Sequence, residues 1–346
     1  MFMKKPNRLT KGATIAIISP SWGGSSVFQH VYEKGIERLK KFGFKIKEYP
    51  SVKIDEEILY KNPQIRAKDV NDAFADKEVE GIICTIGGED SIRVLPFLDA
   101  DLIKNNPKFF MGYSDITTFN TYFNQLGIVT FNGPAVMAGF ADPVELQKEF
   151  INFVNLFLFD CWNEFKYEPY SKYTEVRYNW NDPNCLNIKN TNYHITDGWN
   201  FIQGDKIVEG ELFGGCIEVF EFMKGTKFWP NENFWKNKIL FFETSEDKPT
   251  PYQVSCFLRN YGSQGILDKI NGILFGRAKN YSDEEKKKLD ELIIKILKEF
   301  NIEDLVVVTN LDFGHTDPQL IIPLGIKAQI NPRDKSFKLI ENIWNK

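Results

Sequence analysis

Short apolar runs alternate with helix-like stretches along the first part of the chain. Runs such as "TIAIISP", "GIICTIGG" and "KFFMGYS" are typical of buried strands. The stretches between them, such as "FQHVYEKGIERLKKFGF" and "DITTFNTYFNQLG", repeat their apolar residues at helical spacing, and "SIRVLPFLDADLIKNN" is also expected to be helical. This alternation predicts βαβ units and a mostly parallel sheet, in which ligands bind at the carboxyl ends of the strands.

A second series of the same kind begins near Lys206, with the apolar runs "KIVEGELFGG", "NKILFFET", "INGILFG" and "LVVVTNL". Ser282 and Glu285 form a capping box before a regular apolar stripe, which predicts a helix. The end of the chain predicts a hairpin around Asn331 to Asp334. The segment between the two series is rich in Tyr, Trp and Asn and has no clear periodicity.

The chain is therefore expected to have three parts. Residues 1–160 form an N-terminal domain, 161–204 a linker with an extended aromatic loop or hairpin, and 205–346 a C-terminal domain. A length of 346 residues also suits two domains better than one core. Long irregular segments like the middle one are often functional lids.

Composition narrows the possible functions. The net charge is −4 and the Lys-rich stretches are interleaved with Glu and Asp, so a nucleic-acid polymer is not expected as a partner. No apolar stretch approaches the roughly 20 residues that span a bilayer, and the amino terminus is interpreted as a first strand and not a signal peptide. The five cysteines are scattered without CxxC spacing, which favours a reducing cytoplasm over a disulfide framework.

The stretch "FFMGYSDITTFN" raises the first question of chemistry. Ser114 follows an apolar run and comes directly before a helix, with Asp115 behind it. One interpretation is that Ser114 or Asp115 caps the helix. The other is a nucleophile elbow, in which a sharp turn lifts the hydroxyl above the sheet, although Ile116 stands where that motif has a second glycine. This stretch alone favours the cap.

A serine nucleophile needs a base and a group that orients the base. Among only three histidines, His315 follows the very apolar strand "LVVVTNL", and Glu243 ends the apolar strand "KILFFET". One rim of a sheet, meaning the edge where its parallel strands end, can therefore hold both side chains. A surface histidine and a salt-bridged carboxylate remain alternatives. In "TIGGEDS", Gly87-Gly88 permits a close backbone approach and positive φ, so the N–H groups of Gly88 and Asp115 could form an oxyanion hole. Nucleotide-binding glycine motifs and a metal-ligand cluster are absent, so neither a cofactor nor a metal is expected.

These stretches together resemble the family of LD-carboxypeptidases and microcin C immunity proteins. The resemblance covers nearly the whole chain and includes "GIICTIGGEDS", "FMGYSDITTFN", "EGELFGGCIEVFEFMKGT", "ILFFETSED", "GILFGRAK" and "LDFGHTDPQLIIPLG". It implies a Ser-His-Glu triad of Ser114, His315 and Glu243, with the oxyanion hole named above. It also implies a Rossmann-like N-terminal domain, a C-terminal α/β domain with a swivelling or barrel-like sheet, an active site at their interface, and a homodimer.

The two branches of this family imply different substrates, either an aminoacyl or peptidyl nucleotidylate such as processed microcin C, or a murein tetrapeptide that loses its terminal D-alanine. "TIGGEDS" looks more like the immunity branch, and the aromatic segment could stack a nucleobase. Trp180, Trp199 and Glu89 are the candidate substrate contacts. Cys216 departs from the family pattern, which often has Asn there, and Asn132 stands where a His is common. A non-catalytic binder of nucleotides or peptides is the rival hypothesis.

Overall fold

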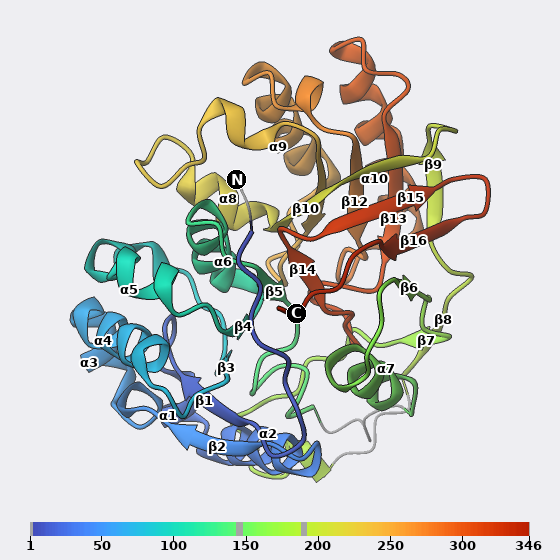
Figure 1. Cartoon of the computed structure of the whole chain (residues 1–346). Coiled ribbons are helices and arrows are strands. Elements are labelled where there is room, and N and C mark those ends of the chain that lie inside the picture. Colours follow the sequence, from blue (N-terminus) through green and yellow to red (C-terminus); the bar gives the residue numbers. More distant parts are fainter. Residues whose placement is uncertain (1–2, 143–147, 188–191, 346) are drawn as a thin grey trace.

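The computed structural model describes residues 3–142, 148–187 and 192–345. Two sheets carry most of the strands and are flanked by helices (Figure 1). This agrees with the two α/β units expected from the sequence. The second sheet runs from β6 to β9 as an open sheet, so the barrel-like closure is not found among the described strands.

The first sheet has the strand order β14-β5-β4-β3-β1-β2. Strands β1 to β5 are parallel, and β14 adds antiparallel to β5. The order changes direction at β1, which pairs with β2 on one side and with β3 on the other. Loops that leave such a switch point commonly hold ligands. The strands are β1 (Thr14–Ile18), β2 (Lys45–Glu48), β3 (Gly81–Cys84), β4 (Phe109–Met111), β5 (Thr130–Asn132) and β14 (Ile322–Leu324).

Alternating side chains of this sheet enter two separate cores. In β1, Ala16 and Ile18 pack with helices α4 to α6, while Ile15 and Ile17 pack in the larger core with α2 and α7. The helices of this part are α1 (Gly24–Val27), α2 (Gln29–Lys41), α3 (Glu56–Lys61), α4 (Pro63–Ala75), α5 (Ala100–Asn105), α6 (Thr117–Gln125) and α7 (Lys148–Phe159).

The stretch 91–106, which was expected to be helical throughout, forms two short 3-10 turns followed by α5. Pro96 lies in the second turn, where its ring cannot continue a regular α-helical hydrogen-bond ladder. The Asp99 carboxylate then begins α5 by accepting a hydrogen bond from the N–H of Leu102, at 2.9 Å. The sequence interpretation of a single helix here was wrong.

The second sheet has the order β6-β16-β15-β10-β11-β12-β13-β9. Strands β10 to β13 are parallel, and the strands on both flanks are antiparallel. Strands β6 and β9 come from the segment expected to be a linker, and β7 and β8 of the same segment form a small antiparallel pair. The strands are β6 (Phe165–Tyr167), β7 (Lys172–Tyr173), β8 (His194–Ile195), β9 (Asn200–Gln203), β10 (Val208–Cys216), β11 (Lys238–Glu243), β12 (Gly272–Gly276), β13 (Val306–Leu311), β15 (Lys327–Asn331) and β16 (Ser336–Leu339).

Helices α8 (Ile217–Met223), α9 (Pro251–Ser263) and α10 (Asp283–Glu299) belong to this second unit. The capping box predicted for α10 is present, since the Ser282 side chain accepts from the N–H of Glu285 and the Glu285 side chain accepts from the N–H of Ser282. The predicted terminal hairpin is the pair β15 and β16. Across the described ranges, no helix combines the length and apolar character that crossing a membrane requires.

Candidate active site

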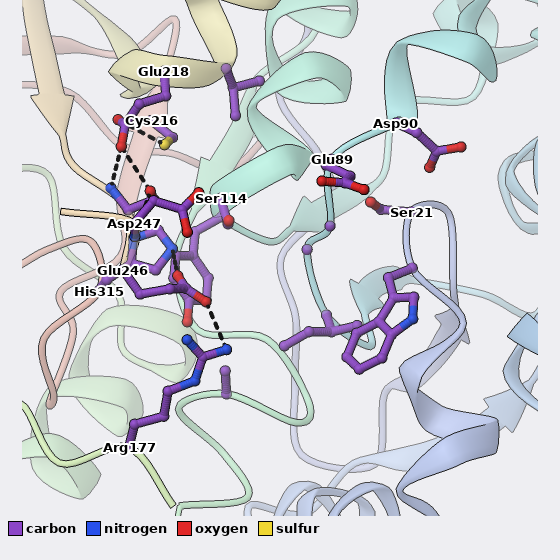
Figure 2. Close-up of a pocket in the computed structure, with 18 of the residues that line it drawn as sticks. Ser21, Glu89, Asp90, Ser114, Arg177, Cys216, Glu218, Glu246, Asp247 and His315 are labelled. Carbon is purple, nitrogen blue, oxygen red and sulfur yellow. Dashed lines mark hydrogen bonds and ion pairs between the residues drawn. The ribbon is translucent and has the colours of Figure 1, made fainter. Parts of the chain in front are cut away.

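A cavity of about 460 Å³ lies at the carboxyl ends of the parallel strands of both sheets. Loops after β1, β3 and β4 line one side of it, and loops after β10, β11, β12 and β13 line the other. Ser114 and His315 both face this cavity (Figure 2). The sheet edges thus bring together side chains about 200 positions apart in the sequence, as expected for parallel strands.

Ser114 lies in a strained turn between β4 and the helical segment that follows. Its φ is 60°, in the left-handed region that non-glycine residues rarely adopt. Neither this 3-10 turn nor α6 has a side-chain cap, so Ser114 and Asp115 do not cap the helix. The elbow interpretation is therefore the one that fits the backbone, and the missing second glycine is replaced by Ile116 without preventing the turn.

Gly87 allows the loop after β3 to approach this turn. A Cβ atom at Gly87 would lie 2.8 Å from Ser114 Cβ and 3.3 Å from the backbone nitrogen of Asp115. At Gly88, a Cβ would lie 2.4 Å from Ser21 Oγ. Neither glycine has positive φ, so the sequence argument from backbone freedom was wrong at these positions and the argument from close approach explains them.

Gly88 lines the cavity, and the N–H of Asp115 directly follows Ser114 in the turn. The Gly88 N–H donates no hydrogen bond to another described residue. Two donors of this kind beside a hydroxyl could stabilise an oxyanion. The Asp115 side chain has a different task, because its buried carboxylate accepts from Ser21 Oγ and from the N–H of Ser91, and burial raises its pKa.

His315 is oriented from the opposite side by Glu243. The imidazole Nδ1 lies 2.6 Å from Glu243 Oε2, and both side chains are almost fully buried. Gly314 makes this contact possible, since its φ is 99° and a Cβ there would lie 2.7 Å from Glu243 Oε2. The two residues expected to meet on one rim therefore do so.

Glu246 occupies the other side of the imidazole. Its Oε2 lies 3.0 Å from His315 Nε2, and its Oε1 lies 3.1 Å from Arg177 Nη2 (Figure 2). Burial lowers the pKa of His315, but Glu243 and Glu246 outweigh burial and raise the pKa to about 10. The hydrogen bond from His315 holds the pKa of Glu246 well below its usual range. In this arrangement Nε2 faces Glu246, and the imidazole favours its charged form.

The aromatic candidates occupy different places. Trp180 lines the cavity and packs edge-to-face on Phe28, with ring centroids 5.5 Å apart, and Phe28 contacts Trp22 in the same way. Trp199 is not among the described residues that line the cavity, and its indole N–H donates to Asp312 Oδ2 at 2.8 Å. A substrate contact by Trp199 stays a prediction without support from the cavity. Glu89 lines the cavity and is exposed.

Sequence reasoning missed most of the charged residues of this cavity. Among them are Glu246, Asp142, Asp317 and Lys279, none of which was named as a site residue from the sequence. Asp317 lies two positions after His315 and Lys279 follows β12, so strand-end position was a usable signal for both. Within the ranges that the structure describes, no group of His, Cys, Asp and Glu side chains is arranged to hold a metal ion.

Comparison with known proteins assigns the chain to a family. The model of the LD-carboxypeptidase N-terminal domain matches residues 15–133, and that of the LD-carboxypeptidase C-terminal domain matches residues 209–330. The chain belongs to the LD-carboxypeptidase family. Family membership makes it a serine peptidase, and the two matched regions contain Ser114, Glu243 and His315.

Relatives within the family have different names. The chain is 27% identical to the microcin C7 self-immunity protein MccF of Escherichia coli, over 96% of this chain and 94% of that protein. It is 28% identical to a Bacillus subtilis protein named "Probable murein peptide carboxypeptidase", over 96% of this chain and 93% of the relative. A solved structure of MccF in complex with glutamyl sulfamoyl guanosine has a TM-score of 0.87 and 25% identity, covering 99% of both chains.

Proposed function

We propose that this protein hydrolyses an amide bond by means of a Ser-His-Glu triad, and that its substrates are aminoacyl or peptidyl nucleotidylates. The observation that carries the proposal is the strained Ser114, which faces the same cavity as an imidazole held at 2.6 Å by Glu243. Backbone strain at a non-glycine residue is retained where surrounding structure and function require it. A non-catalytic binder would have no use for this combination.

The reaction begins when the substrate amide enters between the two rims. Glu246 leaves Nε2 of His315, and the neutral imidazole accepts the proton of Ser114 as Oγ attacks the carbonyl carbon. The N–H groups of Gly88 and Asp115 stabilise the negative oxygen of the tetrahedral intermediate. His315 then donates the proton to the leaving nitrogen, and Glu243 keeps Nδ1 oriented while stabilising the imidazolium. Water hydrolyses the acyl-enzyme by the same steps.

A nucleotidylate substrate is supported by the aromatic side of the cavity. Trp22 and Trp180 both line the cavity, and Phe28 packs edge-to-face on both of them. Stacking of a base on such a ring contributes roughly 1–3 kcal/mol. The structural relative MccF binds glutamyl sulfamoyl guanosine, which contains a base and an acyl group in one ligand. The same properties would protect a cell from processed microcin C.

A second candidate is removal of the terminal D-alanine from a murein tetrapeptide. The Bacillus subtilis relative carries the name of such an enzyme, and its similarity covers nearly the same share of this chain as that of MccF. The triad chemistry is identical in the two candidates, and only the substrate differs. The expected homodimer and cytoplasmic location are parts of both proposals.

The test is a mass-spectrometric assay of the purified protein with an aminoacyl-sulfamoyl adenosine and a murein tetrapeptide in parallel. Ser114→Ala should lower the rate on the true substrate by on the order of 10⁴-fold or more. Ser336→Ala, on β16 of the second sheet, is the matched control and should retain the rate. Cleavage of the tetrapeptide alone would select the second candidate. Failure of a fluorophosphonate to label Ser114, with neither substrate cleaved, would favour a binder.

A further inference from the structure

Three cationic side chains line the cavity within the described part of the chain, namely Arg66, Arg177 and Lys279. Arg66 is 1% exposed and donates two hydrogen bonds to the Asp90 carboxylate, at 2.7 and 2.8 Å. Arg177 is paired with Glu246. Both guanidinium groups are therefore already paired with a carboxylate of the protein.

Lys279 differs from the two arginines. It follows β12, is only 9% exposed, and has neither a hydrogen bond nor an ion pair with any residue in the described ranges. The side chain is largely buried, and its ammonium group faces the cavity without a hydrogen bond or ion pair to the described residues. An anionic partner would stabilise such a group. Its position on the cavity wall means that a ligand in the cavity can supply the missing partner.

Lys279 lowers the pKa of two nearby carboxyl groups, Asp142 and Asp317, but forms no ion pair with either of them. Burial raises the pKa of Asp142 well above its usual range, and repulsion and a hydrogen bond from Asp317 raise it further. Burial also raises the pKa of Asp317, while Lys279 acts in the opposite direction. Two buried carboxyl groups that raise each other's pKa favour a shared proton over two negative charges.

Apart from His315, the other charged side chains that line the cavity are carboxylates. A negatively charged part of a substrate would be repelled over most of this surface. The carboxylates concerned belong to Glu56, Glu89, Asp90, Glu218, Glu246 and Asp247.

We infer that Lys279 binds an anionic group of the substrate and thereby selects substrates that carry one near the scissile amide. This inference rests on the proposed hydrolase function and names a specificity residue for it. The anion is either the terminal carboxylate of a peptide or the phosphoryl-type linker of a nucleotidylate, since both offer oxygen acceptors to an ammonium group.

The test compares pairs of substrates in which only one member carries the negative charge. One pair is a tetrapeptide with a free or an amidated terminal carboxyl group. The other is an aminoacyl-sulfamoyl adenosine and its neutral counterpart, a 5′-aminoacylamino-5′-deoxyadenosine. Lys279→Met should lower kcat/KM for the anionic member of the accepted pair by about 10- to 100-fold and for the neutral member by less than about twofold. The pair that shows this difference identifies the source of the anion.

Lys279→Arg should restore most of the loss, and Lys288→Met on the exposed face of α10 should leave all rates unchanged. Equal losses on anionic and neutral substrates, or no loss on either, would overturn the inference. Circular dichroism checks folding, and Lys279→Gln is the substitute if the Met variant does not fold. Binding of the same pairs to Ser114→Ala protein tests Lys279 without turnover, so a failure of the proposed hydrolysis and a failure of this inference give different results.

Discussion

The cavity has a first-sheet rim, formed by the loops after β1, β3 and β4, and a second-sheet rim, formed by the loops after β10 to β13. The two rims hold their reactive groups by different means. On the first-sheet rim, Ser114 and the two candidate oxyanion donors are positioned by the backbone, through a φ of 60° and a glycine contact that leaves no room for a Cβ. On the second-sheet rim, Gly314 leaves room for Glu243, but the imidazole of His315 is held by two charges, Glu243 at 2.6 Å and Glu246 at 3.0 Å. Changes on the first rim should therefore act through geometry at every pH, whereas changes on the second rim should act through protonation.

Among changes that leave Ser114 in place, the largest effect is expected at the orienting carboxylate of the second rim. Glu243→Gln keeps the shape of the side chain but removes the charge that stabilises the imidazolium, and its amide can hold the wrong tautomer. We expect kcat to fall by about 10⁴-fold. Steady-state kinetics measures this effect, with Glu299→Gln as an exposed control on α10. A loss of less than tenfold would contradict the role of Glu243.

A steric change on the first rim should have the next largest effect. Gly87→Ala places a Cβ 2.8 Å from that of Ser114 and pushes the loop away from the turn. We expect kcat to fall by about 10²- to 10³-fold, the usual cost of losing an oxyanion donor, with no change in the pH profile. Gly225→Ala, whose Cβ would meet nothing within 4 Å, is the control and should affect stability only. A shifted pH profile in Gly87→Ala would contradict the claim that the first rim acts through geometry alone.

The second rim should respond to pH when Glu246 is changed. His315 must be neutral to accept a proton, so a pKa of about 10 makes kcat/KM rise with pH through the alkaline range. Glu246→Gln removes one of the two negative charges that stabilise the imidazolium, so the pKa falls and the acidic limb moves to lower pH by about 1–3 units. The pH dependence of kcat/KM measures the shift. An unmoved limb would mean that Glu246 does not face His315 in the working enzyme.

The smallest effect concerns the strain stored at the elbow. Ser114→Gly and Ser114→Ala should both be inactive, but glycine accepts a φ of 60° more readily. We expect the Gly variant to have a free energy of unfolding about 1 kcal/mol above that of the Ala variant, measured by urea denaturation. The same two substitutions at Ser336, inside β16, should rank in the opposite order. Equal stabilities at position 114 would argue against strain there.

Several features could be predicted from the sequence because they depend on local patterns. The capping box at Ser282, the terminal hairpin and the two series of parallel strands were expected and are present. Placing Glu243 and His315 on one rim also followed from strand ends alone, because parallel strands end at the same edge. By contrast, helix α7 was not anticipated and the middle segment was expected to be a linker, although its strands β6 and β9 become the two edges of the second sheet.

The sequence by itself determined which groups stand at strand ends, since periodicity and turn residues act over a few positions. Only the tertiary structure decided how those ends face one another across the two sheets. It placed Glu246 on Nε2 of His315 and paired Arg177 with that glutamate. It also left Lys279 largely buried, with no hydrogen bond or ion pair in the described ranges. These contacts depend on distances between residues far apart in the chain and on how deeply side chains are buried. A local sequence pattern predicts neither.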